Sequence, residues 1–275
     1  SKQTCAIVDE VAKRKPRTDW DCTYIPHGIN EKFFYPIVDE KELLEMKKFK
    51  QELMGQKPTD FVLLYVNRNI RRKMPGDCIL AFQHFINQIP KDKRDKCTYV
   101  MHTAPIDEHG TDLPKLIESL APEINVVFSH KKLDNKQMNF LYNIADVTMN
   151  IASNEGFGLG TCESLMAGTP IIVNVTGGLQ DQCGFRVKDK LLTEVDYKEI
   201  KSLHDWKKWE HDEELTWGEW VKPVWPKTRS LMGSVPTPYI FDDRCDWEDA
   251  GNAIKEWYEV GKDGRRECGI KGHEF

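Results

Sequence analysis

Between residues 60 and 175 the chain alternates short apolar runs with longer segments that mix apolar and polar residues. The first run is fully apolar and the others are mostly so, as in strands that are buried on both faces of a sheet. The runs that we expect to form strands are residues 61–66, 97–102, 124–129, 147–151 and 170–175.

The segments between these runs carry apolar residues at helical spacing. Ile79, Phe82 and Ile86 fall on one stripe of a helix, and Asp134 with Gln137 three residues later forms a capping-box pattern. We therefore expect helices over residues 40–54, 77–89, 112–120 and 134–145.

Apolar strands that alternate with amphipathic helices are typical of an α/β fold, in which helices cover both faces of a parallel sheet. Ligands of such sheets bind beyond the carboxyl ends of the strands. The loops that follow residues 66, 102, 129, 151 and 175 are therefore the candidate site loops.

The C-terminal third has a different pattern. Residues 186–235 are rich in Trp, Lys and Glu and show no sheet pattern, so we expect an insertion that is helical over residues 198–211. Residues 238–241 are expected to be a sixth strand. Residues 246–261 are expected to be a helix that begins after Asp246 and ends at Gly261.

Composition excludes several classes of protein. A net charge of −5 and a pI near 5.9 argue against a nucleic-acid partner. The eight cysteines form no C-x-x-C pair, and the N-terminus has no signal-peptide core, so we expect reduced thiols and a cytoplasmic location. No run of apolar residues approaches the ~20 needed to span a bilayer.

Residues 153–170 concentrate the candidate chemistry. Glycines let the backbone turn and approach a ligand closely, and a short helix is expected from about residue 158 to residue 167. The free N–H groups of that helix form a site for an anion such as phosphate. Glu163 lies where it can accept hydrogen bonds from a ribose, and Glu155 lies nearer the reacting centre. Alternatively, the stretch is only a tight turn with a solvated Glu163.

Two basic residues follow the first strand. Arg68 and Lys73 lie five positions apart, directly after residues 61–66, where both could reach a diphosphate at the sheet edge. A solvated basic run is the alternative interpretation.

These residues carry a family resemblance. Glu155, Gly156, Phe157, Gly158 and Leu159, followed by Glu163, match the E-G-F-G-L…E motif of retaining GT-B glycosyltransferases, whose Arg and Lys spacing Arg68 and Lys73 reproduce. The linker residues 25–36 and the stretches 167–170 and 177–178 also resemble that family. The chain is thus similar to the C-terminal, nucleotide-sugar-binding domain of these enzymes, a Rossmann-like half of the GT-B fold.

The resemblance implies roles for these residues. Arg68 and Lys73 would bind the donor diphosphate, Glu163 the ribose, and the backbone of residues 156–159 the sugar and phosphate. Glu155 would contact the transferred sugar as the catalytic residue. Transfer would need neither a metal nor a cofactor besides the donor, because Arg, Lys and the helix N-terminus offset the charge of the leaving diphosphate.

The resemblance also implies a domain organisation. Residues 1–35 would be a remnant of an N-terminal domain with the linker, residues 36–185 and 236–275 the donor domain, and residues 186–235 an insertion. The N-terminal domain, which supplies the acceptor site in this family, is expected to be missing from the chain. The acceptor is an unknown glycan, lipid or protein.

Two other functions remain open: a nucleotide-sugar epimerase of the same architecture, and a non-catalytic module that binds a sugar nucleotide or a protein. Residues 19–21 also spell D-x-D, the metal–diphosphate signature of a different glycosyltransferase fold. We set this match aside because three-residue matches arise readily by chance and no sheet strand precedes it.

Overall fold

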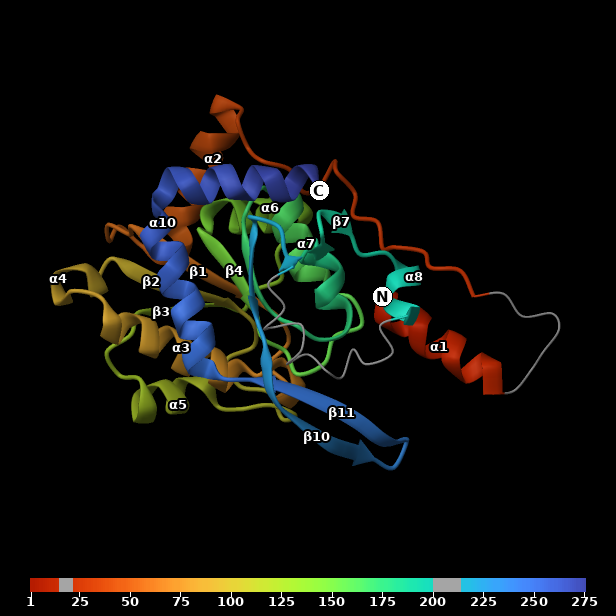
Figure 1. The fold of residues 1–275 in the computed structure, drawn as a ribbon. Coiled ribbons are helices and arrows are strands. Elements are labelled where there is room, and N and C mark those ends of the chain that lie inside the picture. Colours follow the sequence, from red (N-terminus) through yellow and green to blue (C-terminus); the bar gives the residue numbers. More distant parts are fainter. Residues whose placement is uncertain (15–21, 200–213) are drawn as a thin grey trace.

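The computed structural model describes residues 1–14, 22–199 and 214–275 (Figure 1). At its centre lies a parallel sheet with the strand order β3-β2-β1-β4-β5-β9. The strands are β1 (Phe61–Val66), β2 (Cys97–His102), β3 (Val126–Ser129), β4 (Val147–Asn150), β5 (Ile171–Asn174) and β9 (Val221–Val224). This order is that of a Rossmann-like sheet, as expected.

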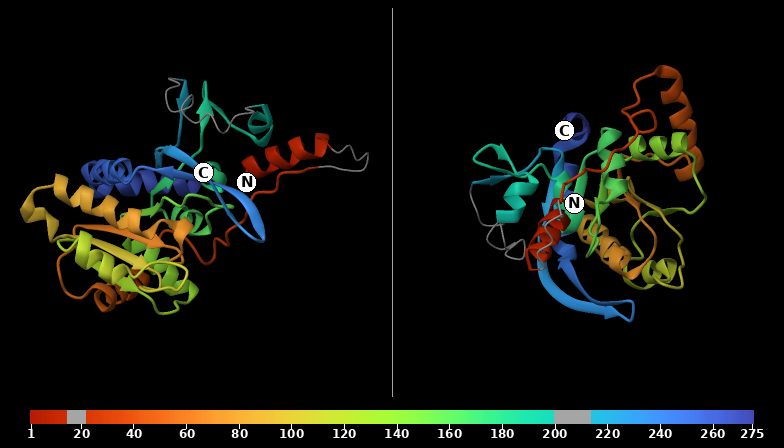
Figure 2. Two further views of the ribbon diagram at one scale, coloured as in Figure 1. Left: turned by 90° about the horizontal axis from the view of Figure 1, so that it is seen from below. Right: turned by 90° about the vertical axis from the view of Figure 1, so that its right-hand side faces the viewer.

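Helices cover both faces of the sheet because consecutive side chains of the buried strands point in opposite directions (Figures 1 and 2). Phe61, Leu63 and Tyr65 of β1 pack into one core with α3, α5 and α10, whereas Val62 and Leu64 pack into another with α2 and α6. The bounds of these helices are α2 (Glu40–Met54), α3 (Pro75–Gln88), α5 (Leu113–Leu120), α6 (Asn135–Ile144) and α10 (Trp247–Glu274).

The five expected strands and the five expected helices between residues 40 and 175 are confirmed within a few residues. The capping box at the start of α6 is present, because Asp134 and Gln137 bond each other's backbone N–H groups.

The sixth strand is not the expected one. β9 pairs in parallel with β5, from Ile171 opposite Val221 to Asn174 opposite Val224. It lies in the segment for which no sheet pattern was expected. Its sequence, Val-Lys-Pro-Val, does not read as a strand, because it contains a lysine and a proline. Pro223 cannot donate a backbone hydrogen bond to a neighbouring strand, which is tolerated on an edge strand.

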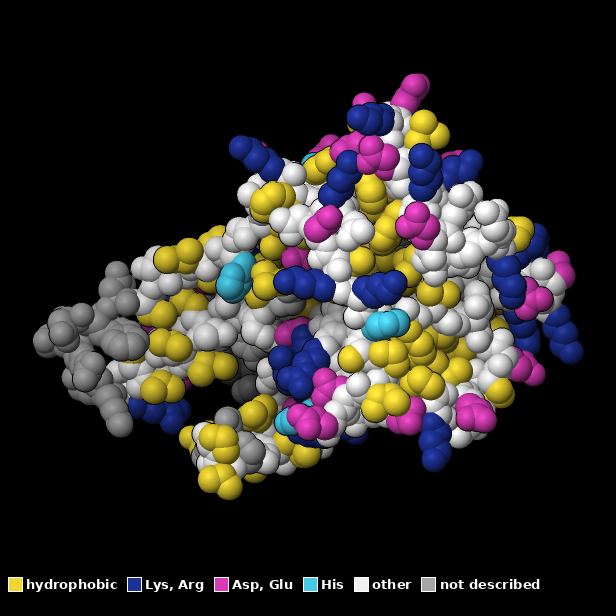
Figure 3. Space-filling view, turned by 180° about the vertical axis from the view of Figure 1, so that it is seen from behind, with side chains coloured by type: hydrophobic (Ala, Val, Ile, Leu, Met, Phe, Trp, Pro, Cys, Tyr) yellow, Lys and Arg dark blue, Asp and Glu magenta, His cyan; other side chains and the backbone are white. Residues whose placement is uncertain are grey.

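Residues 238–241 instead belong to an antiparallel hairpin outside the main sheet. The hairpin consists of β10 (Pro226–Ser234) and β11 (Thr237–Cys245). It extends away from the body of the molecule, and its far end is largely hydrophobic (Figure 3).

Smaller elements surround the sheet. They are α1 (Lys2–Arg14), η1 (Arg71–Lys73), α4 (Lys91–Arg94), α7 (Leu159–Met166), η2 (Gly177–Gln182), α8 (Glu194–Glu199), and a small sheet of β6 (Arg186–Val187), β7 (Lys190–Leu191) and β8 (Leu215–Thr216). α1 packs against α8 and η2. Most of the helix expected over residues 198–211, and the D-x-D stretch at 19–21, lie outside the described residues.

Two tryptophans of residues 186–235 contribute to packing, because Trp220 and Trp225 are buried beside β5 and η2, whereas Trp217 is 41% exposed. The eight cysteines are free thiols. Among the described residues, no helix has both the length and the apolarity to cross a bilayer.

The C-terminal helix continues beyond its expected end. Gly261 does have non-helical angles (φ 78°, ψ 167°), but a second helical segment follows this kink and runs to Glu274. The positive φ explains a glycine at this position.

A buried arginine fixes the segment after the kink to the sheet. Arg265 donates to Asp146 from Nε (3.0 Å) and Nη2 (2.8 Å), and from Nη1 to the carbonyl of Trp257 (2.9 Å). Asp146 in turn accepts from the backbone N–H of Val62 in β1 (2.8 Å). The guanidinium also lies 5.0 Å from the ring centre of Phe61.

Replacing Arg265 by Ala is therefore expected to lower the free energy of unfolding by about 3–5 kcal/mol, because it leaves Asp146 partly buried without its cation. Urea denaturation monitored by circular dichroism measures the change. Arg266→Ala is the matched control, since the neighbouring Arg266 is exposed. Equal losses in the two variants would show that the Arg265 ion pair does not anchor the helix.

Candidate functional site

The candidate site lies where the loops after β1 and β4 meet. β1 and β4 are adjacent in the sheet, and the chain leaves β1 toward β2 on one side and β4 toward β5 on the other. Such a point leaves a crevice at the carboxyl edge of an α/β sheet, and ligands bind there. The loops concerned are residues 67–74 and 151–158.

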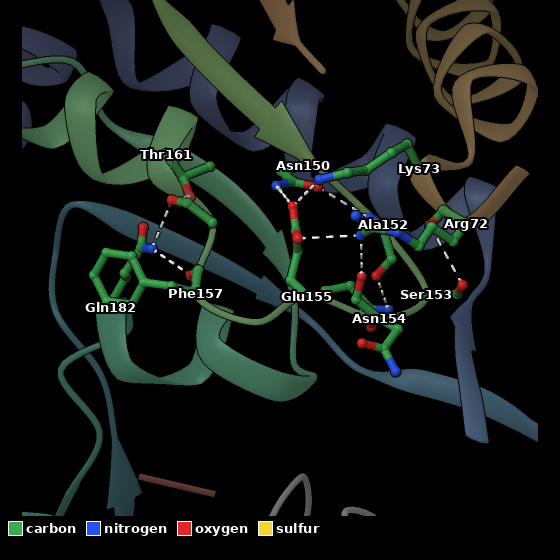
Figure 4. Close-up of polar contacts among 12 residues, drawn as sticks. Arg72, Lys73, Asn150, Ala152, Ser153, Asn154, Glu155, Phe157, Thr161 and Gln182 are labelled. Carbon is green, nitrogen blue, oxygen red and sulfur yellow. Dashed lines mark hydrogen bonds and ion pairs between the residues drawn. The ribbon is translucent and has the colours of Figure 1, made fainter. Parts of the chain in front are cut away.

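Glu155 is the centre of a polar network between these two loops (Figure 4). Its side chain is only 9% exposed. Lys73 Nζ donates to Oε1, Arg72 Nη1 to Oε2 at 3.2 Å, and Asn150 Nδ2 to Oε1 at 3.3 Å. The carboxylate is thus held by two cations from the loop after β1 and one amide from the end of β4.

This environment favours an ionised Glu155. Burial alone would raise the pKa of Glu155, but the hydrogen bond and charge of Lys73, with Asn150 and Arg72, bring it below its usual value. Burial also lowers the pKa of Lys73, against the opposing effect of Glu155. We assign the ion pair as charged because Arg72 holds the second carboxylate oxygen.

The loop that carries Glu155 is held in place by η2. Gly178 donates its N–H to the carbonyl of Glu155 at 2.9 Å, and Gln182 Nε2 donates to the carbonyls of Phe157 (2.8 Å) and Gly158 (2.9 Å). A Cβ on Gly178 would lie 2.2 Å from the carbonyl oxygen of Gly156. The two backbones can approach this closely only because these positions carry no side chain.

The second glutamate lies on the helix that follows the loop. Gly158 begins α7 with a φ of 90°, and Glu163 accepts a 2.7 Å hydrogen bond from the hydroxyl of Tyr142. Burial raises the pKa of Glu163, and this hydrogen bond only partly opposes the effect. A Cβ on Gly160 would lie 3.2 Å from the carbonyl of Val66, so α7 starts against the end of β1.

The two basic residues expected to act together are separated in the structure. Lys73 lies on Glu155, whereas Arg68 forms a two-bond ion pair with Asp107 in the loop after β2, at 2.9 and 3.2 Å. The Arg68 side chain is 61% exposed. Both residues are therefore at the carboxyl edge of the sheet, but they have different partners.

Arg72 and Asn150 are site residues that sequence reasoning missed. η1 is a 3₁₀ turn, in which successive side chains lie about 120° apart. Arg71 reaches Asp242 of the hairpin at 3.1 Å, whereas Arg72 and Lys73 reach Glu155. The run of basic residues was visible in the sequence, but the direction of each side chain was not.

Two histidines, His102 and His27, contact other side chains near this edge of the sheet. His102 Nδ1 lies 3.0 Å from Ser129 Oγ at the ends of β2 and β3, and burial lowers its pKa. The ring of His27 lies 4.6 Å from that of Phe157. In the described ranges, no group of three or more His, Cys, Asp and Glu side chains could hold a metal ion, so we assign no metal ligands.

Known proteins resemble this chain over part of their length. An alpha-monoglucosyldiacylglycerol synthase of Acholeplasma laidlawii is 33% identical over 175 residues, which cover 62% of this chain and 39% of that protein. A D-inositol 3-phosphate glycosyltransferase of Corynebacterium urealyticum is 30% identical over 122 residues, 43% of this chain and 28% of the relative. The matches thus span well under half of these curated relatives.

Solved structures share the fold. Sucrose-phosphate synthase from Thermosynechococcus elongatus superposes with a TM-score of 0.58 and 22% identity, over 97% of this chain and 50% of that chain. Anabaena HepE in complex with UDP and glucose gives a TM-score of 0.59 and 13% identity, over 100% of this chain and 62% of that one. The fold is therefore one half of a GT-B fold, as the motifs predicted.

The comparison with protein families gives the identity of the chain. Residues 46–215, which include β1 to β5 and the network around Glu155, match the model of the family "Glycosyl transferases group 1". This match covers more than half of the sequence. The chain therefore belongs to the glycosyl transferases group 1 family.

Proposed function

We propose that this chain is the donor-binding half of a retaining glycosyltransferase and binds a nucleoside-diphosphate sugar in the crevice between β1 and β4. The observation that carries the proposal is the network of Lys73 and Arg72 on Glu155 at this point of the sheet. The solved complex of Anabaena HepE with UDP and glucose supports a donor of this class.

Each residue has a role in the proposal. Lys73 and Arg68 bind the diphosphate, Arg72 adds a third cation, and Glu163 accepts hydrogen bonds from the ribose. The backbone of residues 156–159 holds the sugar and the phosphate. The start of α7 contributes its free N–H groups to the same anion.

The proposed chemistry rests on charge. As the bond to the sugar breaks, negative charge grows on the diphosphate, and Lys73, Arg72 and the start of α7 stabilise it. Positive charge grows at the anomeric carbon at the same time, and the ionised carboxylate of Glu155 stabilises it. The proposed reaction therefore requires no metal and no cofactor besides the donor.

The acceptor side is also a proposal. The matched regions are less than two thirds of the length of the relatives, so we propose that residues outside this chain bind the acceptor. That acceptor is a glycan, a lipid or a protein, and no nucleic acid takes part.

The family match favours a transferase over an epimerase or a non-catalytic module. Incubation with the donor alone separates these functions: an epimerase changes the sugar without any acceptor, and a transferase does not. A thermal-shift panel of UDP-, GDP- and ADP-sugars identifies the base, because a ligand at 100 times its dissociation constant adds about 2.7 kcal/mol of stability.

Lys73→Ala is expected to weaken binding of the matching nucleoside diphosphate about tenfold or more, because a hydrogen bond to a charged group contributes about 1.5–3 kcal/mol. Arg68→Ala is expected to weaken it in the same direction, and both variants should bind the free nucleoside normally. Isothermal titration calorimetry measures both ligands.

Lys93→Ala is the matched control, because this lysine is exposed on α4, which precedes β2 at the opposite edge of the sheet. Equal losses for nucleoside and diphosphate would place Lys73 and Arg68 away from the phosphates.

Glu155→Gln and Glu163→Gln are expected to impair different steps, catalysis and nucleotide binding respectively. The ribose contact of Glu163 is present in the ground state, so its loss should weaken binding even of the sugar-free diphosphate. Glu155→Gln should keep diphosphate affinity but lower donor hydrolysis, because its charge acts on the transition state. Calorimetry and a turnover assay measure the two effects. Loss of diphosphate affinity in both variants alike would contradict this division of roles.

The chain by itself is expected to bind donor but to transfer sugar poorly, because we place the acceptor site outside it. Transfer is assayed with the donor found in the panel, and donor affinity is measured with and without a metal chelator. Efficient transfer by the 275-residue chain would contradict the first expectation. Donor affinity that falls when the chelator is added would contradict the proposal that no metal takes part.

A further inference from the structure

Arg68 is bound to a carboxylate on the side of β1 that faces away from Glu155. β2 and β4 flank β1 on opposite sides, and Asp107 belongs to the loop after β2, whereas Glu155 belongs to the loop after β4. Arg68 Nε donates to Asp107 Oδ2 at 2.9 Å, and Nη2 donates to Oδ1 at 3.2 Å. Arg72 and Lys73, from the same loop as Arg68, instead contact Glu155. The ion pair therefore draws Arg68 toward β2 and away from the crevice.

The loop that carries Asp107 is fixed by a buried asparagine. Asn69 donates from Nδ2 to the carbonyl of Thr111 at 2.7 Å and accepts from the N–H of Thr111 at 3.1 Å. A Cβ on Gly110 would lie 2.2 Å from the carbonyl oxygen of Asn69, so the two backbones are in close contact. Asp107 also accepts from the N–H of His109 at 2.9 Å, and its side chain is only 12% exposed. The carboxylate therefore has a defined position before any ligand binds.

Asp107 is ionised at neutral pH. The hydrogen bonds from Arg68, and next the one from the His109 N–H, lower the pKa of the Asp107 carboxyl below its usual value. The contact with Asp107 in turn raises the pKa of Arg68. The ring Nδ1 of His109 lies 3.9 Å from Asp107 Oδ1. Arg68 thus has a negative charge beside it, which offsets its attraction for an anion in the crevice.

The ion pairs of this loop differ in how easily they open. Lys73 and Glu155 are both nearly buried, and breaking such a pair leaves an uncompensated buried charge. Most of the Arg68 side chain is exposed, and an exposed pair contributes little to stability because water solvates the separated charges. Arg68 is therefore the cation that can change partners when an anion arrives.

Resting on the proposed function, in which Arg68 binds the diphosphate, we propose that Asp107 is a positioning residue that holds Arg68 at β2 and competes with the diphosphate for it. When the diphosphate enters the crevice, Arg68 exchanges the carboxylate for phosphate oxygens, while Lys73 keeps its contact with Glu155. The competition lowers the affinity for the free diphosphate more than for the donor, because the free diphosphate carries more negative charge. Asp107 thereby favours release of this product after transfer.

The test is isothermal titration calorimetry of the full chain with UDP, GDP and ADP at physiological ionic strength. Asp107→Asn keeps the size of the side chain and an oxygen that can accept from the His109 N–H, but it removes the charge. The variant is expected to bind the diphosphate that the parent chain binds about twofold to fivefold more tightly, because the exposed pair that it removes is weak. The gain should be smaller for the corresponding diphosphate-glucose. A purely structural role of Asp107 would weaken binding or leave it unchanged.

Glu108→Gln is the matched control. Glu108 lies in the same loop, its side chain is exposed, and its carboxylate is 3.3 Å from His109 Nδ1. Removing this charge should change the diphosphate affinity less than Asp107→Asn does, because water and ions screen an exposed charge. The double variant Arg68→Ala, Asp107→Asn is expected to bind like Arg68→Ala, since Asp107 acts through Arg68.

Weaker or unchanged diphosphate binding by Asp107→Asn would overturn the proposal, as would an equal gain in Glu108→Gln. In either case, a loss of affinity in Arg68→Ala would leave the proposed function standing. Failure of all three diphosphates to bind the parent chain would overturn the proposed function itself, and with it the role of Asp107.

Discussion

The contact of the Glu155 carboxylate with Lys73 and Arg72 joins the two loops on which the site depends. The cations belong to the loop after β1, and the carboxylate belongs to the loop after β4. These strands are neighbours in the sheet, so the sheet brings the two loops together and the ion pair fixes their relative position. A buried charge that lost its partner would be strongly unfavourable, which makes this arrangement the stable one.

Under the proposed function, the same contact prepares the crevice for an anion. Lys73 is nearly buried, and burying a lysine without a counter-charge is costly. Glu155 supplies that counter-charge in the free protein. In that proposal an arriving diphosphate shares the cations with Glu155, so the positive charge that it needs is in place beforehand and few groups must reorganise.

The sequence was sufficient for β1 to β5 and their helices because buried strands and amphipathic helices have distinct periodicities. It failed at β9, where Lys222 and Pro223 interrupt the pattern of an edge strand. It also failed beyond Gly261, since a glycine with positive φ marks a kink as well as an end. In both places the contacts that decide the structure come from distant parts of the chain.

The candidate site was predictable in outline. The glycines and Glu155 could be found from their spacing, because a close backbone approach requires glycine. The sequence could not show that Arg72, and not its basic neighbour Arg71, contacts Glu155. Which arginine does so depends on the direction in which each side chain leaves η1. The pairing of Arg68 with Asp107 likewise joins two loops that are far apart in the sequence.

The geometry of η1 has a consequence for how this protein can vary. Arg71 binds the hairpin and the next two residues bind Glu155, so one turn of three residues serves two parts of the molecule. Inserting or deleting a single residue there would rotate the following side chains by about 120° and exchange their partners. The length of the segment is therefore constrained as strictly as its charge, and related chains that keep both contacts should differ here by substitution, such as Lys for Arg, and not by insertion or deletion.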